Sequence, residues 1–474
     1  MKHYQFLNTK RAEPSKLGAE LRVNNHNEIY ESYDQSEASE QAERCLDCGI
    51  PYCKWDCPVS NNIPEWLNLI SEGKLIAAAE LSHQTNSFPE ICGRVCPQDR
   101  LCEGACTLND GFGAITIGSI EKFITDMAFN MGWQPTVKKK IDETKLVSII
   151  GAGPAGLACA DFLSREGIKA VVYDRYEEIG GLLSYGIPNF KLEKDIVKKR
   201  REVLENMGVE FRLRTNVGVD IQFEEILYNS SAVFLALGTY KSLEGNLNIE
   251  KDCTDILLSL NYLIDRIQPI INNERKTSIE SLEGQDVLIL GGGDTAMDCS
   301  RTAIREKAKS VKVIYRRDFE NSPGSRKEKE NAIEEGIEFI WNSQVKKLNY
   351  TGNRLVSVTT VKTSLEKDPH SSRLTPKELE GSEEEIKADK VIIAYGFAPQ
   401  LPEWVNKNNI KRDENDRVLV TSSDSENAYR TSNSKIFAGG DMVRGSDLVV
   451  TAIYEGREAA KSIAKYLHSS SFQN

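Results

Sequence analysis

The sequence has few histidines, no long apolar run and no excess of positive charge. Five histidines occur among 474 residues and none stands in a motif, which argues against a mechanism based on histidine acid–base chemistry. No stretch of eighteen apolar residues is present, so we expect no membrane span. The formal net charge of −11 argues against a broad surface for nucleic acid or anionic membranes.

The first residues also lack the features of a secretion signal. MKHYQFLNTKRAEP has neither an apolar core nor a small-residue cleavage site. We therefore expect a cytoplasmic protein, where clustered cysteines bind metals more often than they form disulfides. A chain of 474 residues is too long for one core, so we expect two or three domains.

Eight of the eleven cysteines lie within the first 106 residues, in two spaced groups. The groups are Cys45-x2-Cys48-x4-Cys53-x3-Cys57-Pro58, and Cys92-x3-Cys96-Pro97 followed by Cys102 and Cys106. In bacterial ferredoxins the cysteine before a proline ligates the other of two clusters, so we expect the groups to cross. This assigns Cys45, Cys48, Cys53 and Cys106 to one [4Fe-4S] cluster and Cys57, Cys96 and Cys102 to the other, with Cys92 as the evident eighth ligand. Structural zinc and disulfides are the alternatives.

A first glycine-rich signature, GAGPAG at 151–156, follows the apolar segment 145–150 and opens an alanine-rich segment. A strand before it and a helix after it are the context that the dinucleotide fingerprint requires. Its glycines allow a tight turn and a close approach to pyrophosphate, and a helix N-terminus attracts phosphate. We expect a dinucleotide there, with Asp174 accepting from ribose hydroxyls, and the turn residues that bind it are Gly151, Gly153, Pro154, Ala155 and Gly156.

Three further segments resemble flavin-binding elements of the flavoproteins with two dinucleotide folds: EIGGLLSYGIP (178–188), ALGT (236–239) and AGGD (438–441). The resemblance implies that the dinucleotide is FAD and that Asp441 holds its ribityl or pyrophosphate region. The further FAD residues it implies are Gly181, Leu182, Gly238, Gly440, Thr451 and Ala452. Disulfide reductases of that superfamily carry a cysteine pair after the GG, and this chain has GGLLSYG there. Electrons must therefore leave the flavin by another route.

A second signature, GGGDTAMD at 291–298, follows the apolar segment 286–290. Ala296 replaces the third glycine, a variant common where nicotinamide dinucleotides bind. The next predicted strand ends in Arg316 and Arg317 instead of an acid, and arginine there accommodates a 2′-phosphate. We therefore expect NADPH in preference to NADH, bound by Gly291, Gly293, Asp294, Thr295, Ala296, Arg316, Arg317 and Arg326. The alternative is that the arginines form a solvated basic cluster.

The order of these elements predicts an α/β chain: a helical N-terminal iron–sulfur domain, then two doubly wound, Rossmann-like domains, the second inserted in the first. The expected ranges are 1–140 for the [4Fe-4S] domain, 141–280 and 426–474 for the two segments of the FAD domain, and 281–425 for the NADPH domain. The highly charged segment 366–389 is expected to form a solvated hairpin or loop.

Several long passages resemble the small (beta) subunits of bacterial NADPH-dependent glutamate synthases over practically the full chain, and the same module in the N-terminal half of dihydropyrimidine dehydrogenase. Among them are RCLDCGIPYCKWDCPV, GLLSYGIPNFKLEK, LGGGDTAMDC and IFAGGDMVRGSDLVVTAIYEGREAA. In that family a side-chain oxygen replaces one thiolate, and Glu121 stands at the matching position. The resemblance therefore implies Glu121, in place of Cys92, as fourth ligand of the Cys57/Cys96/Cys102 cluster.

The resemblance also implies a function, that of an electron-input subunit. It would oxidise NADPH, take the hydride on FAD and pass electrons through the clusters to FMN on a large (alpha) subunit. The reaction supported is the conversion of L-glutamine, 2-oxoglutarate and NADPH into two L-glutamate and NADP+, and no acid–base side chain is needed for hydride transfer. One alternative is a related flavin and iron–sulfur oxidoreductase with another acceptor, such as ferredoxin, a sulfur species or a pyrimidine. A zinc-stabilised scaffold with vestigial nucleotide folds is a third reading.

Overall fold

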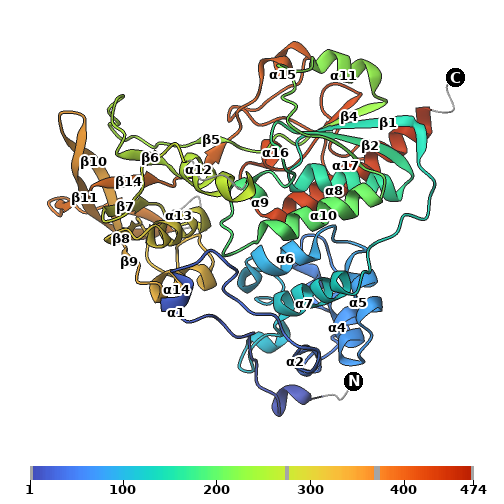
Figure 1. The fold of residues 1–474 in the computed structure, drawn as a ribbon, viewed down its shortest axis with the longest axis horizontal. Coiled ribbons are helices and arrows are strands. Elements are labelled where there is room, and N and C mark those ends of the chain that lie inside the picture. Colours follow the sequence, from blue (N-terminus) through green and yellow to red (C-terminus); the bar gives the residue numbers. More distant parts are fainter. Residues whose placement is uncertain (1–3, 273–276, 368–373, 471–474) are drawn as a thin grey trace.

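The computed structural model describes residues 4–272, 277–367 and 374–470, and Figure 1 shows them as three regions. The N-terminal helices (blue to cyan) lie below, a first sheet with its helices lies above them, and a second sheet lies to the left. The chain enters the first sheet, leaves it for the second and returns to the first near its C-terminus. This topology confirms the expected α/β architecture with one doubly wound fold inserted in the other.

The N-terminal region consists of short helices around one apolar core. In helix α4 the apolar residues recur at helical spacing and are buried: Ile63, Trp66, Leu67 and Ile70. The helices are α1 (Ala19–Arg22), α2 (Gln35–Ala42), α3 (Tyr52–Trp55), α4 (Ile63–Ser71), α5 (Leu75–Ser82), α6 (Pro89–Val95) and α7 (Ile117–Asn130), with 3₁₀ turns at Gln5–Leu7, Gln98–Arg100 and Thr107–Asn109.

The first sheet has five parallel strands in the order β16-β4-β1-β2-β3. The side chains of successive residues of β1 point to opposite faces of this sheet. Ile149 belongs to the core that includes α8, α10 and α17, and Ile150 belongs to the core that includes α11 and α15. The strands are β1 (Asp142–Ile150), β2 (Ile168–Tyr173), β3 (Glu210–Arg212), β4 (Ala232–Leu235) and β16 (Ile436–Ala438), and the helices are α8 (Pro154–Arg165), α9 (Leu182–Tyr185), α10 (Lys194–Asn206), α11 (Phe223–Asn229), α15 (Glu403–Lys407), α16 (Asp441–Arg444) and α17 (Val449–Ser470).

The second sheet is also parallel, in the order β6-β14-β7-β8-β9. Its elements are β6 (Ile256–Leu258), α12 (Ser259–Asn272), β7 (Asp286–Leu290), α13 (Asp294–Arg305), β8 (Ser310–Ile314), α14 (Arg326–Glu334), β9 (Glu338–Ile340) and β14 (Lys390–Ile393). The antiparallel strands β10 (Ser343–Thr351), β11 (Arg354–Lys367), β12 (Leu374–Glu378) and β13 (Glu384–Lys387) extend this region. The charged segment 366–389 therefore contains strands β12 and β13, and its residues 368–373 lie outside the described residues.

Two placements differ from the boundaries expected at 280 and 425. Strand β6 pairs with β14, so residues 256–258 complete the second sheet and do not belong to the first. In α15, Trp404 stacks on Phe223 at 4.1 Å between ring centroids and donates from Nε1 to Val217 O, so it packs with the first sheet. The chain crosses between the two folds through the short antiparallel pair β5 (Lys241–Ser242) and β15 (Phe397–Ala398).

Buried polar contacts hold the N-terminal helices against the first sheet. Arg200 of α10 forms an ion pair with Glu90 of α6, with 2.6 Å between Nη2 and Oε2, and both side chains are buried. From α17, Arg457 donates to the carbonyls of Val59 and Thr85. A buried pair of this kind is costly to break from one side, so the two regions are held in one arrangement.

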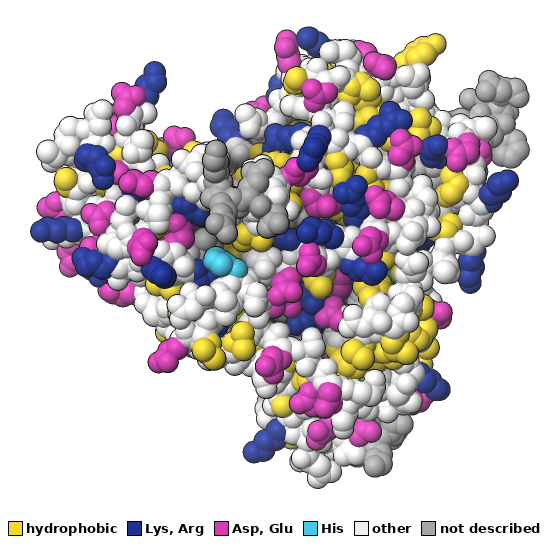
Figure 2. Space-filling model, in the orientation of Figure 1, with side chains coloured by type: hydrophobic (Ala, Val, Ile, Leu, Met, Phe, Trp, Pro, Cys, Tyr) yellow, Lys and Arg dark blue, Asp and Glu magenta, His cyan; other side chains and the backbone are white. Residues whose placement is uncertain are grey.

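On the face shown in Figure 2, basic and acidic side chains are interspersed, and neither sign forms a continuous surface. Among the described residues, none of the helices combines the length and the apolar character that a membrane crossing requires.

Candidate functional site

The first glycine signature forms the turn between β1 and α8, and each of its glycines is favoured there for a different structural reason. Gly151 has φ +109°, and a Cβ at Gly151 would lie 2.3 Å from Ala236 O. A Cβ at Gly156 would lie 2.0 Å from Gly151 O, so that position lets the helix pack against its own turn. Around Gly153, by contrast, no atom lies within 4 Å of a Cβ. This open space above a helix N-terminus fits the close approach of a pyrophosphate.

Asp174 lies at the end of β2 beside this turn. Its carboxylate accepts from the backbone N–H groups of Ala152 (2.7 Å) and Tyr176 (2.9 Å). Burial raises the pKa of Asp174, and these two hydrogen bonds oppose the effect. Asp174 therefore joins the glycine turn to the second strand and also lines the cavity where a ribose would lie.

The C-terminal flavin motif meets the first motif in space. Gly440 has φ +75°, and a Cβ there would lie 2.9 Å from the Cβ of Ala155. Asp441 follows it, accepts from Thr239 Oγ1 at 3.3 Å, and has its pKa raised to about 7 by burial. Glu455, which the sequence reading missed, accepts from Gly440 N at 2.6 Å and so fixes this turn. Glu455 lies on α17, fifteen residues after Gly440, so no motif near Gly440 in the sequence indicated it.

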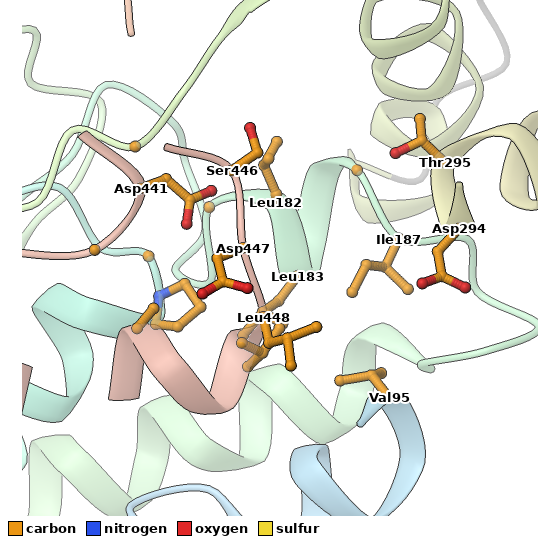
Figure 3. Close-up of a pocket in the computed structure, with 18 of the residues that line it drawn as sticks. Val95, Leu182, Leu183, Ile187, Asp294, Thr295, Asp441, Ser446, Asp447 and Leu448 are labelled. Atoms are coloured by element: carbon orange, nitrogen blue, oxygen red, sulfur yellow. The ribbon is translucent and has the colours of Figure 1, made fainter. Parts of the chain in front are cut away.

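These elements surround one cavity of about 930 Å³. Figure 3 shows that its lining side chains come from separate parts of the chain: Leu182 and Asp441 from the first fold, Thr295 from the second fold, and Val95 from the N-terminal helices. The expected residues that line it are Gly151, Gly153, Pro154, Ala155, Asp174, Gly181, Leu182, Gly238, Gly440, Asp441, Ala452, Asp294, Thr295, Arg326 and Cys96. Gly156, Thr451, Gly291, Gly293, Ala296, Arg316 and Arg317 are not part of this lining.

The second glycine signature repeats the first turn between β7 and α13. Gly291 has φ +146°, and a Cβ there would lie 2.3 Å from Ala394 O. At Gly293 the nearest atom to a Cβ is Pro323 Cγ, at 3.9 Å, so a ligand can approach the backbone. Ala296 is fully buried in the third position, where it packs in the core of this fold. The turn therefore fits a second dinucleotide.

The three candidate arginines have different surroundings. The Arg316 side chain is exposed at the end of β8. Arg317 donates to Tyr315 Oη (3.0 Å) and to the carbonyl of Leu374 (3.1 Å), and Arg326 forms an ion pair with Glu320 (2.8 Å). Arg317 and Arg326 therefore have partners within the protein that a phosphate would have to replace.

No disulfide joins any of the eleven cysteines in this structure, all of which lie in its described residues. The structure brings the first predicted set together, because Cys45, Cys48, Cys53 and Cys106 line one small pocket. Pro51, Leu67 and Ile115 complete its walls, which gives the pocket four sulfur donors in an apolar frame. Soft thiolates of this number fit an iron–sulfur cluster. In the described part of the chain, no three His, Cys, Asp or Glu side chains are arranged to hold a single metal ion.

The second predicted set lies between the N-terminal helices and the first sheet. Burial raises the pKa of Cys57 to about 12, and Glu121 and Cys92 add to the effect. Contact with Cys92 and burial raise the pKa of Cys96 well above its usual value. Both candidates for the eighth ligand are therefore next to the same thiols, and the donor set fits a second cluster.

Glu121 is a buried carboxyl held in place by two amides. Its Oε1 accepts from Asn61 Nδ2 and Asn86 Nδ2, each at 3.1 Å, and burial raises its pKa to about 8. Cys92 Sγ instead donates to Asn86 Oδ1 at 3.6 Å. Asn61 and Asn86 were missed from the sequence, since neither stands in a cysteine or glycine motif.

Comparisons with known proteins agree with these sites. Residues 22–133 match the family described as dihydropyrimidine dehydrogenase domain II, 4Fe-4S cluster, and residues 145–456 match pyridine nucleotide-disulphide oxidoreductase. The first range contains all eight cysteines of the two groups, which favours iron–sulfur over zinc. Among solved structures, FprA from Mycobacterium tuberculosis in complex with NADPH shares the fold, with a TM-score of 0.58 and 14% identity over 70% of this chain and 86% of that one.

Full-length relatives are much more similar. The glutamate synthase [NADPH] small chain of Halomonas elongata is 53% identical over 98% of both chains, and that of Escherichia coli (strain K12) is 52% identical with the same coverage. Such identity over whole chains, together with iron–sulfur and FAD- and NADPH-binding folds in the expected order, identifies the family. The chain belongs to the small chains of NADPH-dependent glutamate synthase.

Proposed function

We propose that this chain is the electron-input subunit of a cytoplasmic glutamate synthase. It oxidises NADPH and delivers the electrons to FMN on a large subunit, which converts L-glutamine and 2-oxoglutarate into two L-glutamate. The observation that carries the proposal is the single cavity shared by the FAD turn, the NADPH helix and Cys96. One space thus adjoins the hydride donor, its acceptor and the exit for electrons.

The residues of the first fold bind and orient FAD. The turn at Gly153 and the N-terminus of α8 receive the pyrophosphate, Asp174 the ribose, and Asp441 the ribityl side. When bound, FAD accepts two electrons as a hydride and releases them one at a time. The apolar side chains Leu182 and Leu448 face the cavity in Figure 3 and would limit the access of water to a flavin bound there.

The two groups of cysteines pack against different parts of the protein, and this difference supports an order of electron transfer between the two proposed clusters. Cys96 lines the flavin cavity and packs, with Cys57, against the core of the first fold. Cys45, Cys53 and Cys106 instead pack only against the core of the N-terminal helices. We propose that the Cys57/Cys96/Cys102 cluster receives electrons first and that the Cys45/Cys48/Cys53/Cys106 cluster passes them to the large subunit.

Reconstitution tests this proposed function. The chain, loaded with FAD and clusters, should oxidise NADPH with ferricyanide alone and form glutamate only after its cognate large subunit is added. NADPH oxidation by the mixture should then depend on both glutamine and 2-oxoglutarate. A mixture that forms a stable complex but shows no such dependence would remove glutamate synthesis from the proposal.

Replacing Arg316 with Ala should raise the KM for NADPH about 10- to 150-fold and leave that for NADH nearly unchanged. A hydrogen bond to a charged group contributes about 1.5–3 kcal/mol, and about 1.4 kcal/mol corresponds to a factor of ten. Steady-state kinetics with both coenzymes measures the effect. In the matched variant Arg317→Ala, the lost bonds to Tyr315 and Leu374 should lower thermal stability more than coenzyme selectivity. Equal effects of Arg316→Ala on both coenzymes would contradict the assignment.

Glu121→Ala should remove one cluster, and Cys92→Ser should leave both. A buried carboxyl with a raised pKa is stabilised strongly by a nearby metal, whereas Cys92 already donates to Asn86. Iron analysis should give about four irons per chain for the first variant and about eight for the second. EPR of the reduced proteins identifies which cluster is lost. The opposite pattern would make Cys92 the ligand.

A further inference from the structure

A short segment of the first fold reaches into the second fold beside the cavity. Residues 187–193 connect α9 to α10, and the buried Lys194 fixes their path by donating from Nζ to the carbonyls of Leu183 (3.0 Å), Leu192 (3.1 Å) and Ile187. Phe190 of this segment is buried between two guanidinium groups of α13, with its ring centroid 4.5 Å from Arg301 Cζ and 3.9 Å from Arg305 Cζ. The segment is therefore packed on the helix that begins at the second glycine turn.

Lys191 makes the charged contact between the two folds. Its Nζ lies 2.8 Å from Asp298 Oδ1 on α13 and 3.5 Å from Glu328 Oε2 on α14, and all three side chains are largely buried. Burial lowers the pKa of Lys191, but these carboxylates outweigh it and raise the pKa, so Lys191 stays charged. These two carboxylates are sufficient to explain the position of Lys191.

The contact of Lys191 is one end of a larger buried network. Arg301 binds Glu328 (2.6 Å) and Glu335 (2.9 Å), and Glu335 also binds Arg305 (2.7 Å) and Arg22 (2.9 Å). The network joins all three regions of the chain, with these members: Lys16, Lys191, Arg22, Arg301 and Arg305 as cations and Asp298, Glu328, Glu334 and Glu335 as carboxylates. Removing the charge of Lys191 would leave the buried carboxylate of Asp298 without its ion-pair partner.

This network adjoins the place where hydride must pass. Lys191 and Asp298 line the cavity together with Ile187 and Thr295. In Figure 3, Ile187 from the first fold and Asp294 and Thr295 from the start of α13 all lie at the cavity. Asp298 lies one helical turn after Asp294, so the Lys191–Asp298 pair joins the first turns of α13 to residues 187–193 of the first fold.

We propose that Lys191 is a positioning residue for hydride transfer. Through Asp298 and Glu328 it holds the start of α13 in register with residues 182–187, so that the nicotinamide meets the flavin without a rotation between the two folds. Lys191 is not a catalytic residue, since its effect is transmitted by the placement of α13. The inference rests on the proposed roles of the two dinucleotide sites and extends them to how the sites are aligned.

The variant Lys191→Met, which removes the charge at similar length, tests the inference in the isolated chain. In anaerobic stopped-flow experiments, the limiting rate of FAD reduction at saturating NADPH should fall by about 100-fold, as expected for a misplacement of about 1 Å. The apparent Kd for NADPH should change much less, because the glycine turn and Arg316 are intact. Lys191→Arg should restore most of the rate. Lys198→Met, on an exposed side chain of α10, is the matched control and should behave like the wild type.

A second measurement separates positioning from folding and does not depend on catalysis. Without NADPH, amide hydrogen exchange in Lys191→Met should become faster in 187–193 and in 294–305 and remain unchanged in α17. The double variant Lys191→Met, Asp298→Asn removes both charges, so it should regain thermal stability but not the limiting rate. If Lys191→Met reduces FAD at the wild-type rate, or loses rate only in proportion to lost FAD, the inference is wrong. If the wild type itself fails to reduce FAD with NADPH, the proposed function fails instead.

Discussion

Replacing Cys96 with Ala should abolish NADPH-dependent glutamate synthesis in the reconstituted complex while NADPH still reduces FAD. Cys96 is the cysteine that lines the flavin cavity, and it lies with Cys57, Cys102 and Glu121 in the group between the two regions. Alanine supplies no thiolate, so in the proposed assignment the cluster at Cys57, Cys96 and Cys102 would lose a ligand and electrons would lose their exit from the flavin. The half-reaction with NADPH needs neither cluster and should keep its rate.

Three measurements check this result. The iron content should fall from about eight to about four atoms per chain. The rate of FAD reduction in stopped-flow experiments should be unchanged, and the rate of glutamate formation should drop to background. Cys253→Ala is the matched control, because Cys253 lies in the connection before β6, outside both thiol groups, and should keep both clusters. Glutamate formation at the wild-type rate by Cys96→Ala would place the electron route elsewhere.

Replacing Gly153 with Ala should produce a folded chain that retains little FAD. No protein atom lies within 4 Å of the added Cβ, and the backbone of Gly153 is extended, so folding itself should be unaffected. The methyl group would instead occupy the space that fits the pyrophosphate. Overpacking costs about 1–3 kcal/mol, which corresponds to an affinity roughly 5- to 150-fold weaker.

The second glycine turn gives the matched variant. At Gly293 the backbone is also extended, and the nearest atom to a Cβ is 3.9 Å away. Gly293→Ala should therefore keep FAD but bind NADPH more weakly by a similar factor. Flavin absorbance after gel filtration, titration with NADPH, and thermal unfolding together distinguish the two. Loss of NADPH binding in Gly153→Ala with FAD retained would show that the two turns have been assigned the wrong way round.

Most of the candidate site could be predicted from the sequence because its chemistry is local. A glycine turn requires particular residues at particular spacings. Gly151 and Gly291 both have a positive φ, and at both a carbonyl oxygen would lie 2.3 Å from a Cβ. The cysteines of the first group could also be recognised from their spacing. Cys45 and Cys48 lie in the loop after α2, and Cys53 lies in helix α3 directly after that loop.

Other features depended on contacts between distant segments. The expected range 141–280 placed residues 256–258 in the FAD domain, because three apolar residues fit either sheet and only the pairing of β6 with β14 decides between them. Nothing in the sequence around Trp404 indicated that it packs with the first sheet. That placement follows from its stacking on Phe223. The different surroundings of Arg316 and Arg317 likewise depend on Leu374, which lies 57 residues from Arg317.

The sequence by itself indicated which groups carry the chemistry: two glycine turns for dinucleotides, two N-terminal groups of cysteines for clusters, and the order of the three regions. It could do so because backbone conformation and ligand type depend on residues close together in the chain. Only the tertiary structure decided how these groups face one another. It placed Cys96 on the flavin cavity and joined Lys191 to Asp298, 107 residues away, because packing and the pairing of buried charges select partners by position in space.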